Sequence, residues 1–405
     1  MMKRISSGLK SLALVLILSM TSLAGSVARA EVQTLSSANN GFGFSLVKEL
    51  EKAKPGENLF ISPYSISTAL QMVRAGAAGE TKAEMDKVLG TAGTDRKALA
   101  QAYKELDQSI RSAASNAVLN IANAIWYAPN IELKPEFSAL NSEFYGAKLS
   151  ALDFTDPRAA GIVNGWVEEA THGKIKQLVE GPLSGLTGAF LCNAIYFKGT
   201  WEKQFAKNET QDRPFHLAYG QQKTVPMMHQ KREFQYQESD TFQGVHLAYA
   251  GSHLGMYVFL PKTNSSPQKL SDELKRAGWA GTVSKFAHRE GTLMMPRFKM
   301  EYEAELKRPL EALGMRRAFS PGTADFSDIA SAGLYVDAVK HKSFVEVNEE
   351  GTEAAAATGV IMKMTAVQRG PQPFQMIVDR PFVFVIEDGP SHTILFLGEV
   401  TDPGA

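Results

Sequence analysis

The segment from residue 341 to residue 364 constrains the fold most, because a strand pattern there runs directly into a stretch of small residues. Residues 343–347, Ser-Phe-Val-Glu-Val, are β-branched or aromatic around Glu346, which predicts a half-buried strand. Residues 349–351, Glu-Glu-Gly, then form a polar break with a glycine that can take unusual backbone angles. The sequence therefore predicts a strand that ends at a hinge.

The residues after this hinge fit two structures. The even positions from Thr352 to Met364 are small or apolar, while Glu353 and Lys363 fall on odd positions, as in a strand that buries one face. The run of alanines at 354–357 instead favours a helix, although propensity decides little in a short segment. The motifs described below favour the strand.

The first 30 residues contain the three regions of a secretory signal. Lys3 and Arg4 precede an apolar run at 12–20, and small residues ending in Ala-Arg-Ala at 28–30 supply a cleavage site. A membrane anchor is the alternative, but the run is too short to span a bilayer comfortably, and no later stretch is long enough. We expect residues 1–30 to be a cleaved signal peptide. The mature protein would be exported without a membrane attachment, as a secreted, extracellular or periplasmic protein.

The charge and the cysteine content argue against a nucleic-acid partner and an intramolecular disulfide. The chain has 43 basic and 43 acidic residues, and removal of residues 1–30 leaves a net charge of −4, which argues against a nucleic-acid partner. The one cysteine, Cys192, lies in an apolar strand pattern, so we expect a small buried core residue and no intramolecular disulfide. Stability must come from the core, and the 375 residues after the signal can bury a large one.

Helical patterns dominate the first part of the chain and strand patterns the second. Predicted helices cover residues 38–53, 81–89, 95–113, 137–145 and 157–172. Ser62-Pro63 opens one more, with a serine cap and a proline in the first turn. Predicted strands cover residues 118–127, 189–197, 245–249, 255–260, 292–300, 382–387 and 393–400. Because no linker separates these parts, we predict one α+β domain with N-terminal helices packed on large, mostly antiparallel sheets.

The sequence contains no motif for catalysis or metal binding. G-x-S-x-G, H-E-x-x-H, Cys-x-x-Cys and a Gly-rich phosphate loop are all absent, and the eight histidines have no metal-ligand spacing. We therefore assign no catalytic residue, no metal ligand and no cofactor, and we expect a protein that is not an enzyme.

Four motifs, in the expected order, resemble the serpin superfamily of serine protease inhibitors. HKSFVEVNEEGTEAAAAT at 341–358 resembles the strand, hinge and start of the reactive loop in inhibitory serpins. NLFISPYSI at 58–66 resembles the second-helix motif, and NAIYFKGTW at 193–201 the central-strand motif. VDRPFVF at 378–384 resembles the signature that follows the reactive loop. The resemblance is to a secreted, bacterial-type member.

The resemblance also implies domain boundaries and a mechanism. A short segment, 31–36, would precede a single serpin domain at 37–405, with an exposed reactive loop at about 349–378. In serpins a target protease cleaves this loop, which then inserts into the main sheet while the protease is held as an acyl-enzyme. The inhibitor thus supplies stored strain rather than a catalytic residue.

The resemblance implies that four polar residues act together. Taken alone, Ser62 and Ser65 are helix caps, Asn193 marks a turn and His341 ends a surface strand. In serpins the matching residues form a hydrogen-bonded cluster beneath the main sheet, the shutter, which controls sheet opening. Trp201 matches a tryptophan at the top of the opening strands, although a plain core residue also fits.

The hinge composition favours an inhibitory member over a non-inhibitory carrier or chaperone-like serpin, which is the alternative. Inhibition requires rapid insertion, and this chain places only small side chains on the buried parity of its hinge. The hinge residues are Glu349, Glu350, Gly351, Thr352, Ala354, Ala355, Ala356, Ala357 and Thr358.

The reactive bond is expected between Thr365 and Ala366, fourteen positions after the hinge glycine. Counting from the far end of a loop that is slightly longer than usual makes Arg369 a candidate, and Lys363 and Met364 are further alternatives. The expected partner is an elastase-like or broad-specificity serine protease, with a trypsin-like protease as the alternative. We expect the inhibitor to be a monomer.

Overall fold

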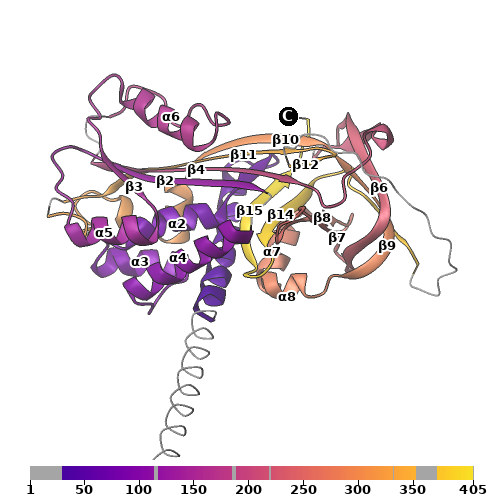
Figure 1. Cartoon of the computed structure of the whole chain (residues 1–405), viewed down its shortest axis with the longest axis horizontal. Helices are drawn as coiled ribbons and strands as arrows, with labels where there is room; N and C mark the ends of the chain where they lie inside the picture. Colours follow the sequence, from indigo (N-terminus) through magenta and orange to yellow (C-terminus); the bar gives the residue numbers. More distant parts are fainter. Residues whose placement is uncertain are drawn as a thin grey trace, which may run out of the picture.

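Two β-sheets and the helices packed on them form the fold of the computed structural model, which describes residues 30–113, 117–184, 188–218, 220–331, 333–352 and 372–404 (Figure 1). The helices are the N-terminal helix over 30–53, α2 (Pro63–Arg74), α3 (Gly79–Leu89), α4 (Arg96–Ala113), α5 (Pro135–Phe144), α6 (Ala159–Ala170), α7 (Pro267–Ala277), α8 (Trp279–Val283) and α9 (Lys307–Leu313), with 3-10 turns η1 (Lys207–Glu209) and η2 (Arg317–Phe319). The strands are β1 (Leu59–Ile61), β2 (Val118–Tyr127), β3 (Lys148–Ala151), β4 (Ala189–Thr200), β5 (Gln211–His216), β6 (Gln222–Glu238), β7 (Phe242–Ala248), β8 (Leu254–Pro261), β9 (Ala287–Pro296), β10 (Phe298–Glu305), β11 (Val336–Val347), β12 (Gly351–Thr352), β13 (Phe374–Ile377), β14 (Phe382–Asp388) and β15 (Thr393–Val400). The predicted α+β class is confirmed.

The main sheet has the order β10-β11-β12-β4-β2-β3 and carries α6 on one face and α2 to α5 on the other (Figure 1). Its central strand β4 is buried along almost its whole length, as the continuous apolar run predicts. Cys192 of β4 is a free, buried thiol that clusters with Val163 and Val167 of α6. Helices on both faces explain why this strand lacks the alternation of a solvent-facing sheet.

The second sheet has the order β1-β15-β14-β8-β7-β6-β9-β13, and β5 pairs with β6. Its neighbours are antiparallel except for β13, which runs parallel to β9. Strands β8, β14 and β15 are buried at every residue, so they form the centre of the core. None of the helices in the described ranges is long and apolar enough to cross a membrane.

The structure corrects two boundaries expected from the sequence. The predicted strand 292–300 is two strands in different sheets, β9 and β10, with a break at Arg297 directly after Pro296. Proline has no N–H to continue a strand ladder, which accounts for the break. The helix predicted over residues 38–53 begins at residue 30, so the short segment 31–36 is helical as well, and Leu35 is buried in the core.

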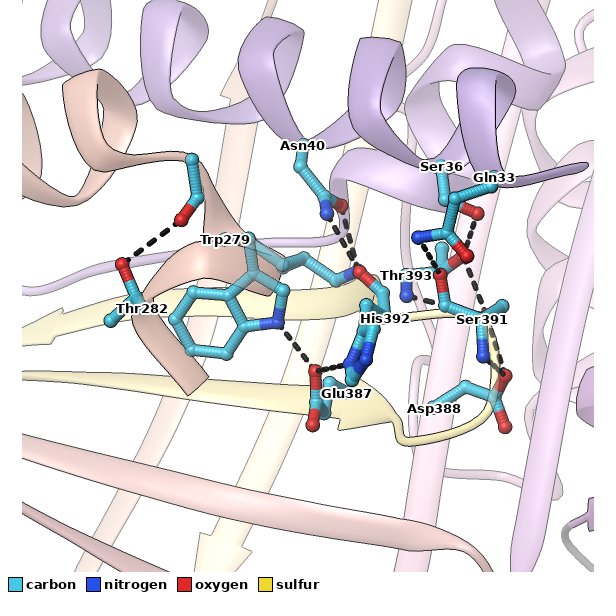
Figure 2. Close-up of polar contacts among 12 residues, drawn as sticks. Gln33, Ser36, Asn40, Trp279, Thr282, Glu387, Asp388, Ser391, His392 and Thr393 are labelled. Carbon is cyan, nitrogen blue, oxygen red and sulfur yellow. Dashed lines mark hydrogen bonds and ion pairs between the residues drawn. The ribbon is translucent and has the colours of Figure 1, made fainter. Parts of the chain in front are cut away.

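Hydrogen bonds fix the N-terminal helix to the hairpin between β14 and β15 (Figure 2). The Asn40 side chain donates to the carbonyl of His392 (2.7 Å) and accepts from the N–H of Ile394 (2.8 Å). The hydroxyls of Ser36 and Thr393 lie 2.6 Å apart. Because these groups are largely buried and satisfy one another, they set the position of the helix on the sheet.

The second sheet should be sensitive to added volume at Gly398, which faces Phe384 across the β14–β15 pair. An added Cβ would lie 2.3 Å from the Phe384 ring and 3.1 Å from the Leu59 carbonyl oxygen. We predict that Gly398→Ala lowers stability by about 1–3 kcal/mol. The control is Gly165→Ala in exposed α6, where nothing lies within 4 Å and the change should raise stability by up to about 1 kcal/mol. Denaturant unfolding of both variants checks this, and equal effects would contradict it.

Candidate functional site

The candidate site lies in the main sheet, where the neighbouring strands β4 and β11 pair over part of their length and then separate. Strands β11 and β4 pair directly and in parallel from Val336 to Phe344. Beyond Phe344 they separate, and β12 lies between them, with Thr352 paired to Val347 of β11 and to Gly199 of β4. Strand β12 is antiparallel to both neighbours. The candidate site is therefore the boundary between β4 and β11, which we call the seam. Its upper end is the part beyond Phe344, where two hinge residues, Gly351 and Thr352, already lie between the strands.

The structure brings Ser62, Ser65, Asn193 and His341 together beneath this seam. His341 Nδ1 lies 2.6 Å from Asn193 Oδ1, and the Ser62 N–H donates to His341 Nε2 at 3.3 Å. Asn193 Nδ2 donates to the Ser65 hydroxyl and to Asn123 Oδ1, the latter at 2.6 Å. Ser62 also caps α2, where its hydroxyl accepts from the Ser65 N–H at 3.2 Å. Strands β2, β4 and β11 are thus tied to the start of α2.

These contacts require a neutral His341. Asn193 Oδ1 can only accept, so His341 Nδ1 carries the proton and Nε2 accepts from the Ser62 N–H. Protonation of Nε2 would place two donors against each other. The ring is fully buried, and this burial lowers the pKa of His341 to about 3.

The sequence analysis missed one member of the cluster, Asn123, and a separate buried hydrogen bond of β11 made by Ser343. Asn123 accepts from Asn193, and the Ser343 hydroxyl donates to the Phe60 carbonyl at 2.6 Å. The pairing registers place Asn123 opposite Asn193, and Asn193 opposite His341, in one row across three strands. The only sequence signal for Asn123 is that it interrupts the apolar alternation of residues 118–127, and its partners follow from the register alone.

Aromatic residues cover the upper end of the seam. Trp201 is buried and stacks on Tyr249, with ring centroids 4.6 Å apart, while its Nε1 donates to the Asn348 carbonyl at 2.9 Å. The Tyr249 hydroxyl lies 2.7 Å from Thr352 Oγ1. Trp201 and Tyr249 therefore hold both sides of the turn that leads into β12.

The acidic residues before the hinge glycine are buried and paired. The Glu349 carboxylate receives hydrogen bonds from Arg297 (2.7 Å) and from the Thr210 hydroxyl. Burial opposes its ionisation, but these donors outweigh burial and lower the pKa of Glu349. Glu350 forms an ion pair with Lys207. The polar break expected at these positions is therefore buried, and partners distant in sequence neutralise both charges.

The expected exposed loop at 349–378 is also too long. Its first four residues are buried, and residues 374–377 form β13. Ten residues that the sequence assigns to the hinge or the reactive bond lie outside the described residues: Ala354, Ala355, Ala356, Ala357, Thr358, Lys363, Met364, Thr365, Ala366 and Arg369. Within the part of the chain that the structure describes, no group of three or more His, Cys, Asp or Glu side chains is placed to hold a metal ion.

Lower pH should weaken the cluster. Because the pKa of His341 is about 3 in the folded protein and about 6.5 when unfolded, the unfolded chain binds a proton first as the pH falls. The stabilisation is complete above pH 6.5 and declines below it, by at most about 1.4 kcal/mol per pH unit. Burial also lowers the pKa of His246, to about 4. Comparison with His341→Ala isolates the contribution of His341.

Denaturant midpoints at pH 7, 6 and 5 provide the measurement. The His341→Ala variant should be less stable at pH 7 but lose less stability on acidification. Equal pH slopes for the two proteins would show that His341 is not held neutral by the fold.

Comparisons with known proteins agree with this arrangement. The family model described as serpin (serine protease inhibitor) matches residues 37–403. The leukocyte elastase inhibitor of Bos taurus is 38% identical over 389 residues, covering 92% of this chain and 100% of the relative. Iripin-2 of Ixodes ricinus is 38% identical over 377 residues, covering 91% of this chain and 94% of the relative.

Solved structures show the same fold. The native state of the thermophilic serpin tengpin superposes with a TM-score of 0.82 at 29% identity, covering 91% of this chain and 94% of that one. Serpin48 of the insect Tenebrio molitor gives 0.81 at 32% identity, covering 91% and 98%. With a family model over most of its length and relatives of this identity and coverage, the chain belongs to the serpin family.

Proposed function

We propose that this protein inhibits a serine protease as a suicide substrate, trapping it as an acyl-enzyme while the cleaved loop enters the seam between β11 and β4. The observation that carries the proposal is the direct parallel pairing of these strands, with β12 already between their upper ends. Family membership and the 38% identity to a leukocyte elastase inhibitor support it.

The residue at the turn into β12 fits a role as a hinge. Gly351 has a φ of 153°, which L side chains rarely adopt, and an added Cβ would lie 2.1 Å from the Gly199 carbonyl oxygen. Only glycine therefore lets the chain reverse this close to β4. Thr352 follows it as the first small residue inside the sheet, fully buried.

Several finer assignments remain our proposals. The target is an elastase-like or broad-specificity serine protease, and the bond cleaved is Thr365-Ala366. Residues 1–30 are a signal peptide, so the mature protein is exported. It acts as a monomer. The small side chains around the expected bond and the elastase inhibitor among the relatives support the target class. N-terminal sequencing of the exported protein, with a first residue of Glu31, tests the signal peptide.

Thr352→Arg should convert the inhibitor into a substrate. Thr352 is fully buried beside the Tyr249 hydroxyl, so an arginine would place an unpaired charge in the sheet. Before cleavage the variant can avoid this cost by withdrawing β12 from the sheet, whereas insertion must bury the charge. That cost exceeds the ~1.4 kcal/mol that a factor of ten requires, so the stoichiometry of inhibition should rise by about tenfold or more.

The measurement is the amount of SDS-stable complex formed with an elastase-like protease. Thr352→Ser is the matched control, because it keeps the hydroxyl and should remain inhibitory. If wild type is cleaved by a panel of proteases without forming complexes or gaining thermal stability, the protein is a non-inhibitory carrier or chaperone-like serpin instead.

The cleaved bond can be read from the fragment released after complex formation. The fifteen residues from Gly351 to Thr365 span roughly 50 Å when extended, at about 3.3 Å each, which is enough to cross the sheet. We expect mass spectrometry to find a C-terminal fragment that begins at Ala366. A fragment that begins at Gly370 would show instead that Arg369 is the residue recognised.

A further inference from the structure

Two glutamates meet in the core between the N-terminal helix, α7 and β15. Glu51 comes from the last turn of the helix and Glu399 from β15, and their carboxyl groups lie within hydrogen-bonding reach of each other. We propose that Glu51 and Glu399 share one proton and form a pH-sensitive clasp, which holds the end of the N-terminal helix on β15 at neutral pH and releases it at alkaline pH. The clasp does not depend on the proposed inhibitory function.

The surroundings of Glu399 disfavour a charge. In the second sheet Glu399 pairs with Leu59 of β1 and Val383 of β14, so these three side chains point to the same face. Leu59 and Val383 belong to an apolar cluster that also contains Leu50 of the N-terminal helix and Leu270 of α7. The Glu399 side chain is only 4% exposed. An ionised carboxylate in such a core is costly unless a cation or several donors compensate it.

The hydrogen bonds around the two carboxyl groups lack a donor. Gln268 Nε2 of α7 donates to Glu399 Oε1 at 3.0 Å. The buried atoms Glu51 Oε1 and Glu399 Oε2 accept from no donor in the described part of the chain. Ionised carboxylates only accept, so two of them in contact would set two charges and two sets of acceptors against each other. One proton on either carboxyl group supplies the missing donor and removes one of the charges.

The lysines on the elements packed against the pair are engaged with other carboxylates. Their ion pairs are Lys48–Asp272 at 2.9 Å, Lys52–Glu49 at 2.6 Å and Lys54–Glu57 at 3.3 Å. Burial and then the contact with Glu51 raise the pKa of Glu399 from its ordinary value of 4.5 to about 10, and only the Gln268 amide acts in the other direction. The pair therefore keeps its proton at neutral pH.

The shared proton makes stability depend on pH in a defined direction. Between about pH 4.5 and about pH 10 the folded protein holds a proton that the unfolded chain has lost. The unfolding constant therefore rises by up to about tenfold for each pH unit in this window and levels off above it. His341 has the opposite effect and acts below about pH 6.5, so the two contributions are separated above pH 7.

The end of the N-terminal helix is the part that yields when the proton leaves. Glu399 is fixed in a strand that is paired on both sides, whereas residues 52–54 are exposed. Glu51 and Gln268 line a pocket of about 310 Å³ between the helix and α7, which gives the proton access to solvent and gives Glu51 room to move. Repulsion between two ionised carboxylates therefore opens residues 48–53 rather than the sheet.

Denaturant unfolding of wild type and Glu399→Gln at pH 7, 8 and 9 tests the shared proton. The glutamine keeps both bonds without a titrating proton, because its oxygen accepts from Gln268 and its amide donates to Glu51. We expect the ratio of the unfolding constants, wild type over variant, to rise by at least about tenfold from pH 7 to pH 9. A constant ratio would overturn the proposal. The control is Glu49→Gln, which removes the partner of Lys52 from the same helix and should give a constant ratio.

Infrared spectroscopy detects the proton in the wild-type protein itself. We expect the C=O stretching band of a protonated carboxyl group at pH 7, and its loss as the pH passes about 10. A spectrum at pH 7 with carboxylate bands alone would overturn the shared proton. This measurement decides the question if Glu399→Gln does not fold.

Amide hydrogen exchange tests the release of the helix end. The ratio of exchange rates, wild type over Glu399→Gln at the same pH, should rise by at least about threefold from pH 7 to pH 9 at residues 48–53. The same ratio should stay constant in α6, which is remote from the pair. An unchanged ratio at residues 48–53 would overturn the release, even where the unfolding constants support the shared proton.

Discussion

The row of hydrogen bonds from Asn123 through Asn193 to His341 joins three strands of the main sheet across the seam between β4 and β11. It crosses the seam that has to open, and it is buried with every member neutral. If apolar side chains occupied these positions, β4 and β11 could shift relative to each other without breaking a hydrogen bond. The polar side chains satisfy their hydrogen bonds in only one register, and loss of a partner costs about 1 to 3 kcal/mol. The bond from the Ser62 N–H to His341 extends this control to α2.

The hinge adds a second constraint at the top of the seam. Arg297 holds Glu349 from the break between β9 and β10, so the turn into β12 is fastened to the junction of the two sheets. Gly351 reverses the chain where no side chain fits. The buried cluster thus joins β2, β4 and β11 where β4 and β11 pair, while Gly351 and Thr352 lie between β4 and β11 beyond Phe344.

The hydrophobic period of the sequence predicts the α+β class, and the Ser-Pro signal predicts the start of α2. The joint role of Ser62, Ser65, Asn193 and His341 was implied only by the resemblance to serpins, because local signals alone indicate two caps, a turn and a strand end. The same Ser-Pro signal at Ser266-Pro267 opens α7, which went unpredicted because strand patterns surround it. The row through Asn123 depends on strand register, and the burial of Glu349 depends on Arg297, 52 residues away. Such pairings depend on tertiary structure, which local patterns do not encode.

The topology also explains why a cut must precede insertion. Among the described residues, β12 lies in the main sheet and β13 in the other sheet, where Phe374 stacks on Tyr236 with ring centroids 3.8 Å apart. A segment held at both ends cannot extend down the seam. Cleavage between these anchors frees one end, and the inserted strand replaces a parallel pairing of β11 with β4 by two antiparallel ladders, the more stable kind. The energy for trapping a protease thus comes from the difference between the parallel pairing of β11 with β4 and the two antiparallel ladders that replace it after cleavage.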